Sequence, residues 1–159
     1  MRRTVSILTL ALLAGVATVP AQAQDNAACA AMVGVWLTTI GTSGGEYASR
    51  SLVTVNADGT LQAIDSAQNQ GLQGSSFSSQ PGVWRCTEAG KASARTLNFG
   101  FPPRDSIARS DWTLSLDGAA LSGSIALHIF PGVKGVDPFR TDSKPVDTFR
   151  FTAQKVSPP

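Results

Sequence analysis

The chain contains few of the residues from which metal centres and covalent catalytic sites are usually built. It has one histidine, His128, and two cysteines, Cys29 and Cys86. A typical zinc site needs three or four Cys, His or carboxylate ligands held close together. Calcium-loop, phosphate-loop and dinucleotide-binding spacings are also missing from the sequence. The composition therefore predicts no metal site and no cofactor.

No apolar run is long enough for a membrane-spanning helix, which needs about 20 residues. The longest run, residues 5–19, has 15 residues. Two arginines precede it and the sequence AQA at 21–23 follows it, an order typical of a secretory signal peptide with an A-x-A cleavage site. We expect residues 1–23 to be a signal peptide and residues 24–159 to form one domain. The mature protein is then exported, to the periplasm or outside the cell.

An excess of one charge sign is missing too. The chain has 13 Lys and Arg against 11 Asp and Glu, and two of the arginines lie in the expected signal peptide. The mature chain is therefore balanced, with 11 residues of each sign. Nucleic acids and anionic membranes are poor partners for such a chain, because counterion release needs a basic cluster. A small apolar ligand is the partner that remains.

An even number of cysteines in an exported chain favours a disulfide. We predict a bond between Cys29 and Cys86, which would tie the N-terminal end of the mature chain to its core. The alternative is two buried thiols in separate places.

The sequence is rich in alternating apolar and polar residues, broken by turn signals. A short helix is expected at 25–34, capped by Asp25 or Asn26 and ended by Gly34. Eight candidate strands follow, at 34–41, 47–56, 60–65, 82–88, 93–101, 108–116, 119–130 and 146–155. Eight antiparallel strands can close on themselves and so remove their edges. The expected fold is all-β, a single eight-stranded antiparallel up-and-down barrel, with a β-sandwich as the alternative.

The interior of such a barrel is either filled by side chains or holds one small ligand. Period-two alternation places large apolar residues of the second half of the chain on one face of each strand. Leu97 is expected in the core. The residues expected to line the lumen and contact a ligand are Phe99, Phe101, Trp112, Leu114, Ile125, Leu127, Phe149 and Phe151.

Several short motifs resemble small secreted β-barrels of the lipocalin and calycin group. They are a Gly-x-Trp opening two strands, at 34–36 and 82–84, an Asp-Gly-Thr at 58–60 and a Leu-x-Gly at 121–123. The resemblance implies a barrel that encloses a ligand. The chain departs from lipocalins in having no expected helix after the last strand. The plain meander is similar in shape to avidin, but the biotin motifs of that family do not map onto its three tryptophans.

One pattern points to catalysis. The sequence GTSGG at 41–45 has the spacing of a hydrolase nucleophile elbow, and Asp111 and His128 follow Ser43 in the order of a triad. An elbow needs a strand followed by a helix, whereas this segment lies between two strands. We therefore interpret it as a glycine-rich hairpin and assign no catalytic residue. His128 is interpreted as an outward-facing or hydrogen-bonded strand residue.

Three functions fit these observations. The first is an exported barrel that binds a small apolar molecule, with the loops at 66–80 and 131–145 at its rim. The second is a structural, interaction or inhibitor-like module of the cell envelope with a filled core. The third is a cyclase or isomerase that works in the lumen, which requires a polar group such as Glu46 or His128 to face the cavity.

Overall fold

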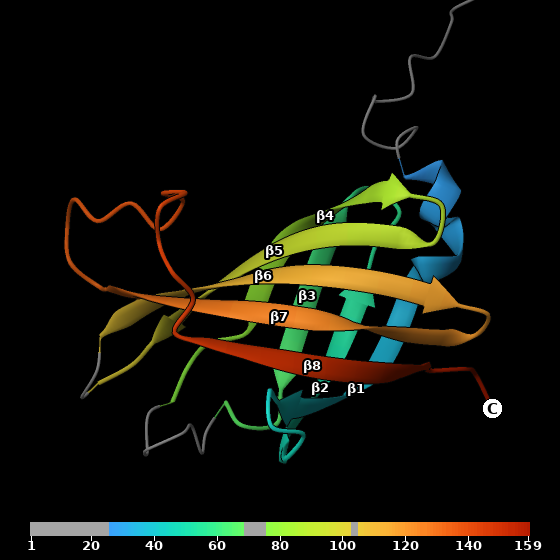
Figure 1. Cartoon of the computed structure of the whole chain (residues 1–159), viewed down its shortest axis with the longest axis horizontal. Coiled ribbons are helices and arrows are strands. Elements are labelled where there is room, and N and C mark those ends of the chain that lie inside the picture. The colour runs from blue at the N-terminus through green and yellow to red at the C-terminus, as the bar shows by residue number, and fades with distance from the viewer. Residues whose placement is uncertain (1–25, 69–75, 103–104) are drawn as a thin grey trace, which may run out of the picture.

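The computed structural model describes residues 26–68, 76–102 and 105–159, which form a closed barrel of eight antiparallel strands in sequence order (Figure 1). A short 3-10 helix, η1 (Ala27–Met32), precedes the barrel. The strands are β1 (Gly34–Thr42), β2 (Tyr47–Val55), β3 (Thr60–Asp65), β4 (Gln80–Glu88), β5 (Lys91–Gly100), β6 (Ser106–Asp117), β7 (Ala120–Pro131) and β8 (Asp147–Lys155). The expected barrel is confirmed, with every strand bound within two residues of its prediction. The predicted signal peptide lies outside the described residues. Within the described part, no helix is both long and apolar enough to cross a bilayer.

The two ends of the barrel differ because the two longest connections both lie at one end. At one end, the closed end, tight turns join the strands, and Gly59, Gly90 and Gly118 supply the positive φ that such turns need. Helix η1 also lies at this end, next to β4 (Figure 1). The other end, the open end, carries the connections from β1 to β2, β3 to β4, β5 to β6 and β7 to β8, of which those after β3 and β7 are the longest of the barrel.

Two buried tryptophans and several alanines occupy the interior of the closed end. Trp36 and Trp84, 1% and 2% exposed, lie among small residues that leave room for their rings. Both indole N–H groups are satisfied, because Trp36 Nε1 donates to Met32 O and Trp84 Nε1 donates to Asn56 O, each at 2.8 Å. The small residues of this core are Ala63, Ala92, Ala94 and Ala153.

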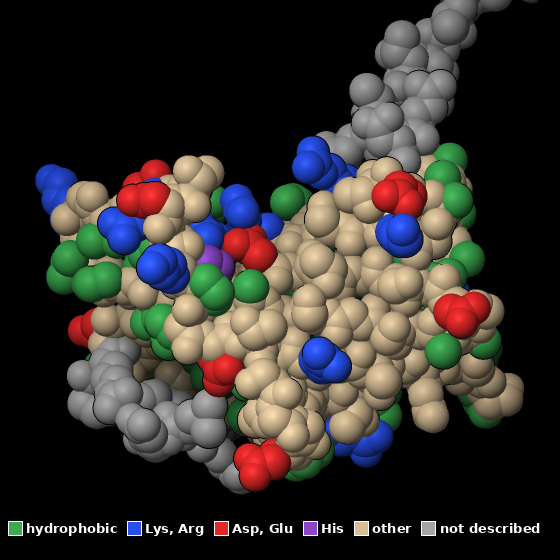
Figure 2. Space-filling model, in the orientation of Figure 1, with side chains coloured by type: hydrophobic (Ala, Val, Ile, Leu, Met, Phe, Trp, Pro, Cys, Tyr) green, Lys and Arg blue, Asp and Glu red, His purple; other side chains and the backbone are tan. Residues whose placement is uncertain are grey.

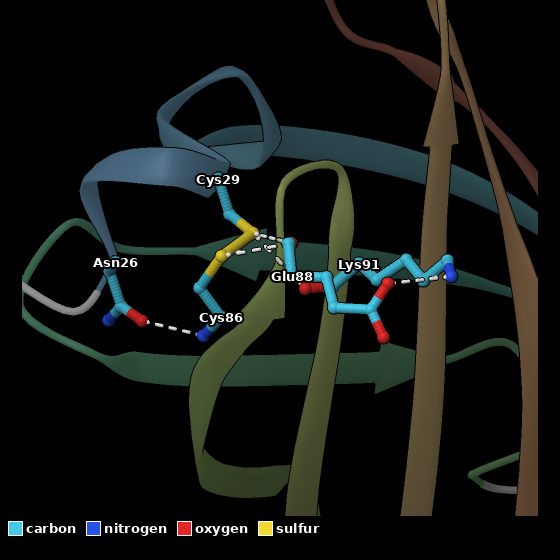
Figure 3. The surroundings of a disulfide bond; sticks show 5 residues. All are labelled: Asn26, Cys29, Cys86, Glu88 and Lys91. Atoms are coloured by element: carbon cyan, nitrogen blue, oxygen red, sulfur yellow. Dashed lines mark hydrogen bonds and ion pairs between the residues drawn. A yellow bond between two sulfur atoms is a disulfide. The ribbon is translucent and has the colours of Figure 1, made fainter.

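The predicted disulfide between Cys29 and Cys86 is present and joins η1 to β4 (Figure 3). Beside it, the backbone N–H of Cys86 donates to Asn26 Oδ1 at 2.8 Å. Asn26 occupies the N-cap position but makes no side-chain cap. Of the two expected caps, Asn26 is wrong, because its oxygen ties the helix to β4 instead, and Asp25 lies outside the described residues.

Two glycines of the recognised motifs allow neighbouring backbones to approach closely. A Cβ at Gly82 would overlap the carbonyl oxygen of Arg95, and a Cβ at Gly123 would overlap that of Thr113. Both overlaps are with backbone atoms of the paired strand, which cannot swing away as a side chain could. The glycines at these positions of the Gly-x-Trp and Leu-x-Gly motifs therefore serve strand packing.

The predicted inward direction of Leu97, Phe99 and Phe101 is wrong. Ala94 is paired directly with Trp112, and directly opposed residues share one face of a sheet. Trp112 is 3% exposed and points inward, so Ala94, Thr96 and Asn98 also point inward. Leu97 and Phe99 then point outward, where Phe99 is 61% exposed, and Phe101, just beyond the strand, is 45% exposed.

Candidate functional site

The open end of the barrel holds a cavity of about 330 Å³. All eight strands contribute to its wall, and Ala67, Ser76 and Phe77 of the connection between β3 and β4 add to its rim. Its volume is at the lower end of the range for small-molecule sites, which is about 300–1,000 Å³. The cavity therefore suits a small molecule better than a long lipid.

The wall of this cavity has an apolar half and a polar half. The apolar half comes from β6, β7, β8 and β1, which are neighbours around the barrel. Its side chains are Ala108, Trp112, Ile125, Leu127, Ile129, Phe149 and Ile40. The polar half comes from β2 to β5, with Ser49, Ser51, Asp65, Gln80 and Asn98. Ser106 and Ser110 of β6 add hydroxyls on the apolar side.

Asp65, the last residue of β3, is the centre of the polar half. It is 9% exposed, and its Oδ2 accepts hydrogen bonds from Ser49 Oγ at 2.9 Å and Ser51 Oγ at 2.6 Å. Its Oδ1 accepts one from the backbone N–H of Ala67 at 2.7 Å. The two serines come from β2, which pairs with β3. The carboxyl group is thus held in one orientation at the cavity wall.

The structure brings together half of the eight residues predicted to contact a ligand. Trp112, Ile125, Leu127 and Phe149 line the cavity. Leu114 and Phe151 are 4% exposed and belong to the packed core instead. Phe99 and Phe101 lie outside the barrel, as described above.

The polar half of the wall was missed because only large apolar residues were considered. A signal for it is present in the sequence. Along β2 the inward residues change from Val55 and Val53 to Ser51 and Ser49, and along β3 they change from Leu61 and Ala63 to Asp65. A core that is filled throughout would stay apolar to its end, so this change marks the hollow end.

His128 lies on the outer side of the barrel wall, where the connection between β7 and β8 covers it. Its side chain is 7% exposed, and its Nδ1 is 3.1 Å from Ser143 Oγ of that connection. Figure 2 shows the purple histidine surface beside acidic and basic side chains. Asp111 Oδ2 lies 3.5 Å from His128 Nε2. The expectation that His128 is a hydrogen-bonded strand residue is confirmed.

A buried arginine fastens the same connection to the barrel. Arg109 of β6 donates from Nη1 to Pro138 O at 2.6 Å and Arg140 O at 3.0 Å, and from Nη2 to Ser143 Oγ at 2.9 Å. Its Nε lies 3.0 Å from Asp111 Oδ2, an ion pair without hydrogen-bond geometry. The connection between β7 and β8 was expected at the rim of the cavity. Its residues 138–143 are bound to the outer surface of the barrel wall instead.

This arrangement predicts that acid destabilises the protein. Burial, and after it the nearby positive charge of Arg109, lowers the pKa of His128 below its usual value, against the opposing effect of Asp111. The unfolded chain then binds a proton more readily than the folded one. The contribution of His128 to the free energy of unfolding is therefore complete above about pH 6.5, the pKa in the unfolded chain, and is lost as the pH falls through the lower pKa of the folded state. We expect a lower urea midpoint at pH 5 than at pH 7.5.

The variant His128→Gln is the control for this titration, because the chain has no other histidine. Its urea midpoint should change less between pH 7.5 and pH 5 than that of the unmodified chain. An equal decrease in both proteins would contradict the assignment.

The segment that matches a nucleophile elbow is a hairpin turn between β1 and β2. Gly45 N donates to Thr42 O at 3.0 Å, and Thr42 N donates to Glu46 O at 2.8 Å. The serine near His128 is Ser143, not Ser43. Ser143 Oγ also accepts a hydrogen bond from the Arg109 guanidinium, which is a structural contact. The interpretation of residues 41–45 as a glycine-rich hairpin therefore agrees with the structure.

No protein-family profile, no curated protein and no solved structure matches this chain. The eight-stranded antiparallel barrel is consistent with a fold of the lipocalin or calycin kind.

Proposed function

We propose that the protein is an exported barrel that binds one small, mainly apolar molecule in the cavity at its open end. The observation that carries this proposal is the contrast between the two ends, one packed with tryptophan and alanine and the other hollow. A barrel with a purely structural role gains stability from filling its interior. Leaving about 330 Å³ unfilled therefore supports a binding role over a module with a filled core.

The two halves of the wall support an amphipathic ligand. Burial of its apolar body against Trp112, Ile125 and Phe149 would provide most of the affinity, at about 25 cal/mol per Å² before the costs of association. Hydrogen bonds to the polar half would set its orientation. Asp65 is also the ionisable group of the described wall that a lumen isomerase or cyclase would use, since His128 lies outside the wall and Glu46 is exposed in a turn.

Export remains part of the proposal. It is supported by the order of the first 23 residues and by the disulfide, which is stable in oxidising compartments and rare in the cytosol.

Filling the cavity should abolish binding. Ala108 lies on the apolar half and is 9% exposed, so Ala108→Trp places a large ring where the ligand would lie. N-phenyl-1-naphthylamine, an uncharged dye whose fluorescence rises in apolar surroundings, is the probe. We expect the variant to bind it at least about tenfold more weakly, because an indole and the dye cannot share the space. Wild-type affinity should change little between low and high salt, since apolar burial is not screened.

Phe99→Ala is the matched control, because Phe99 is a large aromatic residue on the outer surface. It should bind the dye as the unmodified protein does. Equal binding by Ala108→Trp and wild type, with both folded by circular dichroism, would place the dye elsewhere.

A further inference from the structure

We infer that the ligand of the open-end cavity carries a cationic amine on its apolar body, and that Asp65 is the counter-ion. This inference rests on the proposed function and specifies the chemical class of the ligand. It follows from the charge of the wall, from the unused capacity of the Asp65 carboxyl group and from the aromatic residues that line the same cavity.

The carboxyl group of Asp65 still has room for a hydrogen-bond donor. A carboxylate can accept about four hydrogen bonds, and Asp65 accepts three, from Ser49, Ser51 and Ala67. Asp65 is the acceptor in all three of these hydrogen bonds. A further donor could come from a molecule in the cavity, since Asp65 is part of the cavity wall.

No lysine, arginine or histidine of the described residues lies within ion-pair distance of this carboxylate. The ion pairs of the described part involve other acids, and none includes Asp65. Apart from Asp65, the described lining residues are uncharged. A buried charge that is not paired is costly. A ligand ammonium group would therefore gain both a hydrogen bond and a counter-charge here.

The rest of the wall suits the other parts of such a ligand. Phe77, Trp112 and Phe149 line the same cavity, and aromatic faces attract cations as well as apolar groups. The small volume favours a short aryl or alkyl body. Because the mature chain is balanced in charge, a preference for cations has to come from this local group and not from the overall field.

The test compares 2-phenylethylamine, a cation at neutral pH, with 2-phenylethanol, a neutral molecule of the same shape, as competitors of N-phenyl-1-naphthylamine. We expect the wild-type protein to bind the amine about tenfold or more tightly than the alcohol, as expected for a charge-assisted hydrogen bond in a buried site. Phenylacetate, an anion of similar size, should bind more weakly than either.

Asp65→Asn removes the charge but keeps an oxygen that can accept from Ser49 and Ser51. It should bind the amine and the alcohol equally while still binding the dye. Asp58→Asn is the matched control, because Asp58 is an exposed acid in the turn before β3 at the closed end, and it should keep the preference of the wild type.

Each outcome decides a different point. If wild type binds the alcohol as tightly as the amine, or if Asp65→Asn keeps the preference, the inference about the amine is wrong while the binding function stands. If the dye binds equally well to Ala108→Trp, the proposed function itself is wrong. Should Asp65→Asn fail to fold, the comparison of the amine, alcohol and acid on the wild-type protein still decides.

Discussion

Replacing Trp36 by alanine should lower the free energy of unfolding by about 3–5 kcal/mol, the range for truncating a fully buried tryptophan. Trp36 is 1% exposed in the packed closed end. Its Nε1 donates to Met32 O of η1, and Lys155 Nζ lies 5.4 Å from the centre of its ring. The substitution would leave a void in the core and a helix carbonyl without its partner. Urea unfolding followed by circular dichroism measures the loss.

Two further variants test whether this loss comes from packing at the closed end. Val35→Ala changes the neighbouring residue, which faces outward and is 36% exposed, and should cost far less. Trp112→Ala should cost less than Trp36→Ala, because Trp112 borders the cavity and has fewer packing neighbours to lose on that side. If Trp112→Ala were the more destabilising of the two, the assignment of packed and hollow ends would be wrong.

Removing the disulfide should have an effect of similar size. The bond joins residues 57 positions apart, and closing a loop of that length stabilises the folded state by about 4 kcal/mol in the chain-entropy model. The double variant Cys29→Ser, Cys86→Ser should therefore unfold at a clearly lower urea concentration than the oxidised wild type. The bond also holds η1 against β4, so its loss would free the helix that covers the closed end.

Wild type treated with dithiothreitol is the matched control for the double variant. The two should unfold at nearly the same urea concentration, while the reductant should leave the double variant unchanged. An unchanged midpoint in the reduced wild type would mean that packing of η1 alone holds the N-terminal end in place.

The candidate site could be predicted from the sequence only in part. Four of the eight proposed lumen residues line the cavity, namely Trp112, Ile125, Leu127 and Phe149. These four predictions are correct because the residues lie on strands whose outward face carries mainly polar or small side chains. The prediction for β5 failed because its inward face carries Ala92, Ala94, Thr96 and Asn98, while larger residues lie on its outward face. Size and hydrophobicity alone pointed to the wrong face.

The sequence by itself determined the eight strands and their turns, and it favoured an antiparallel barrel over a sandwich and a Cys29–Cys86 bond over two separate thiols. These features depend on local alternation, on glycine and proline signals, and on having two cysteines to pair. The tertiary structure decided which face of β5 points inward, because the register that pairs Ala94 with Trp112 joins residues far apart in the chain. It also decided that one end is hollow and that Asp65 lies in its wall. A cavity is a property of side chains from all eight strands together, and no single segment carries it.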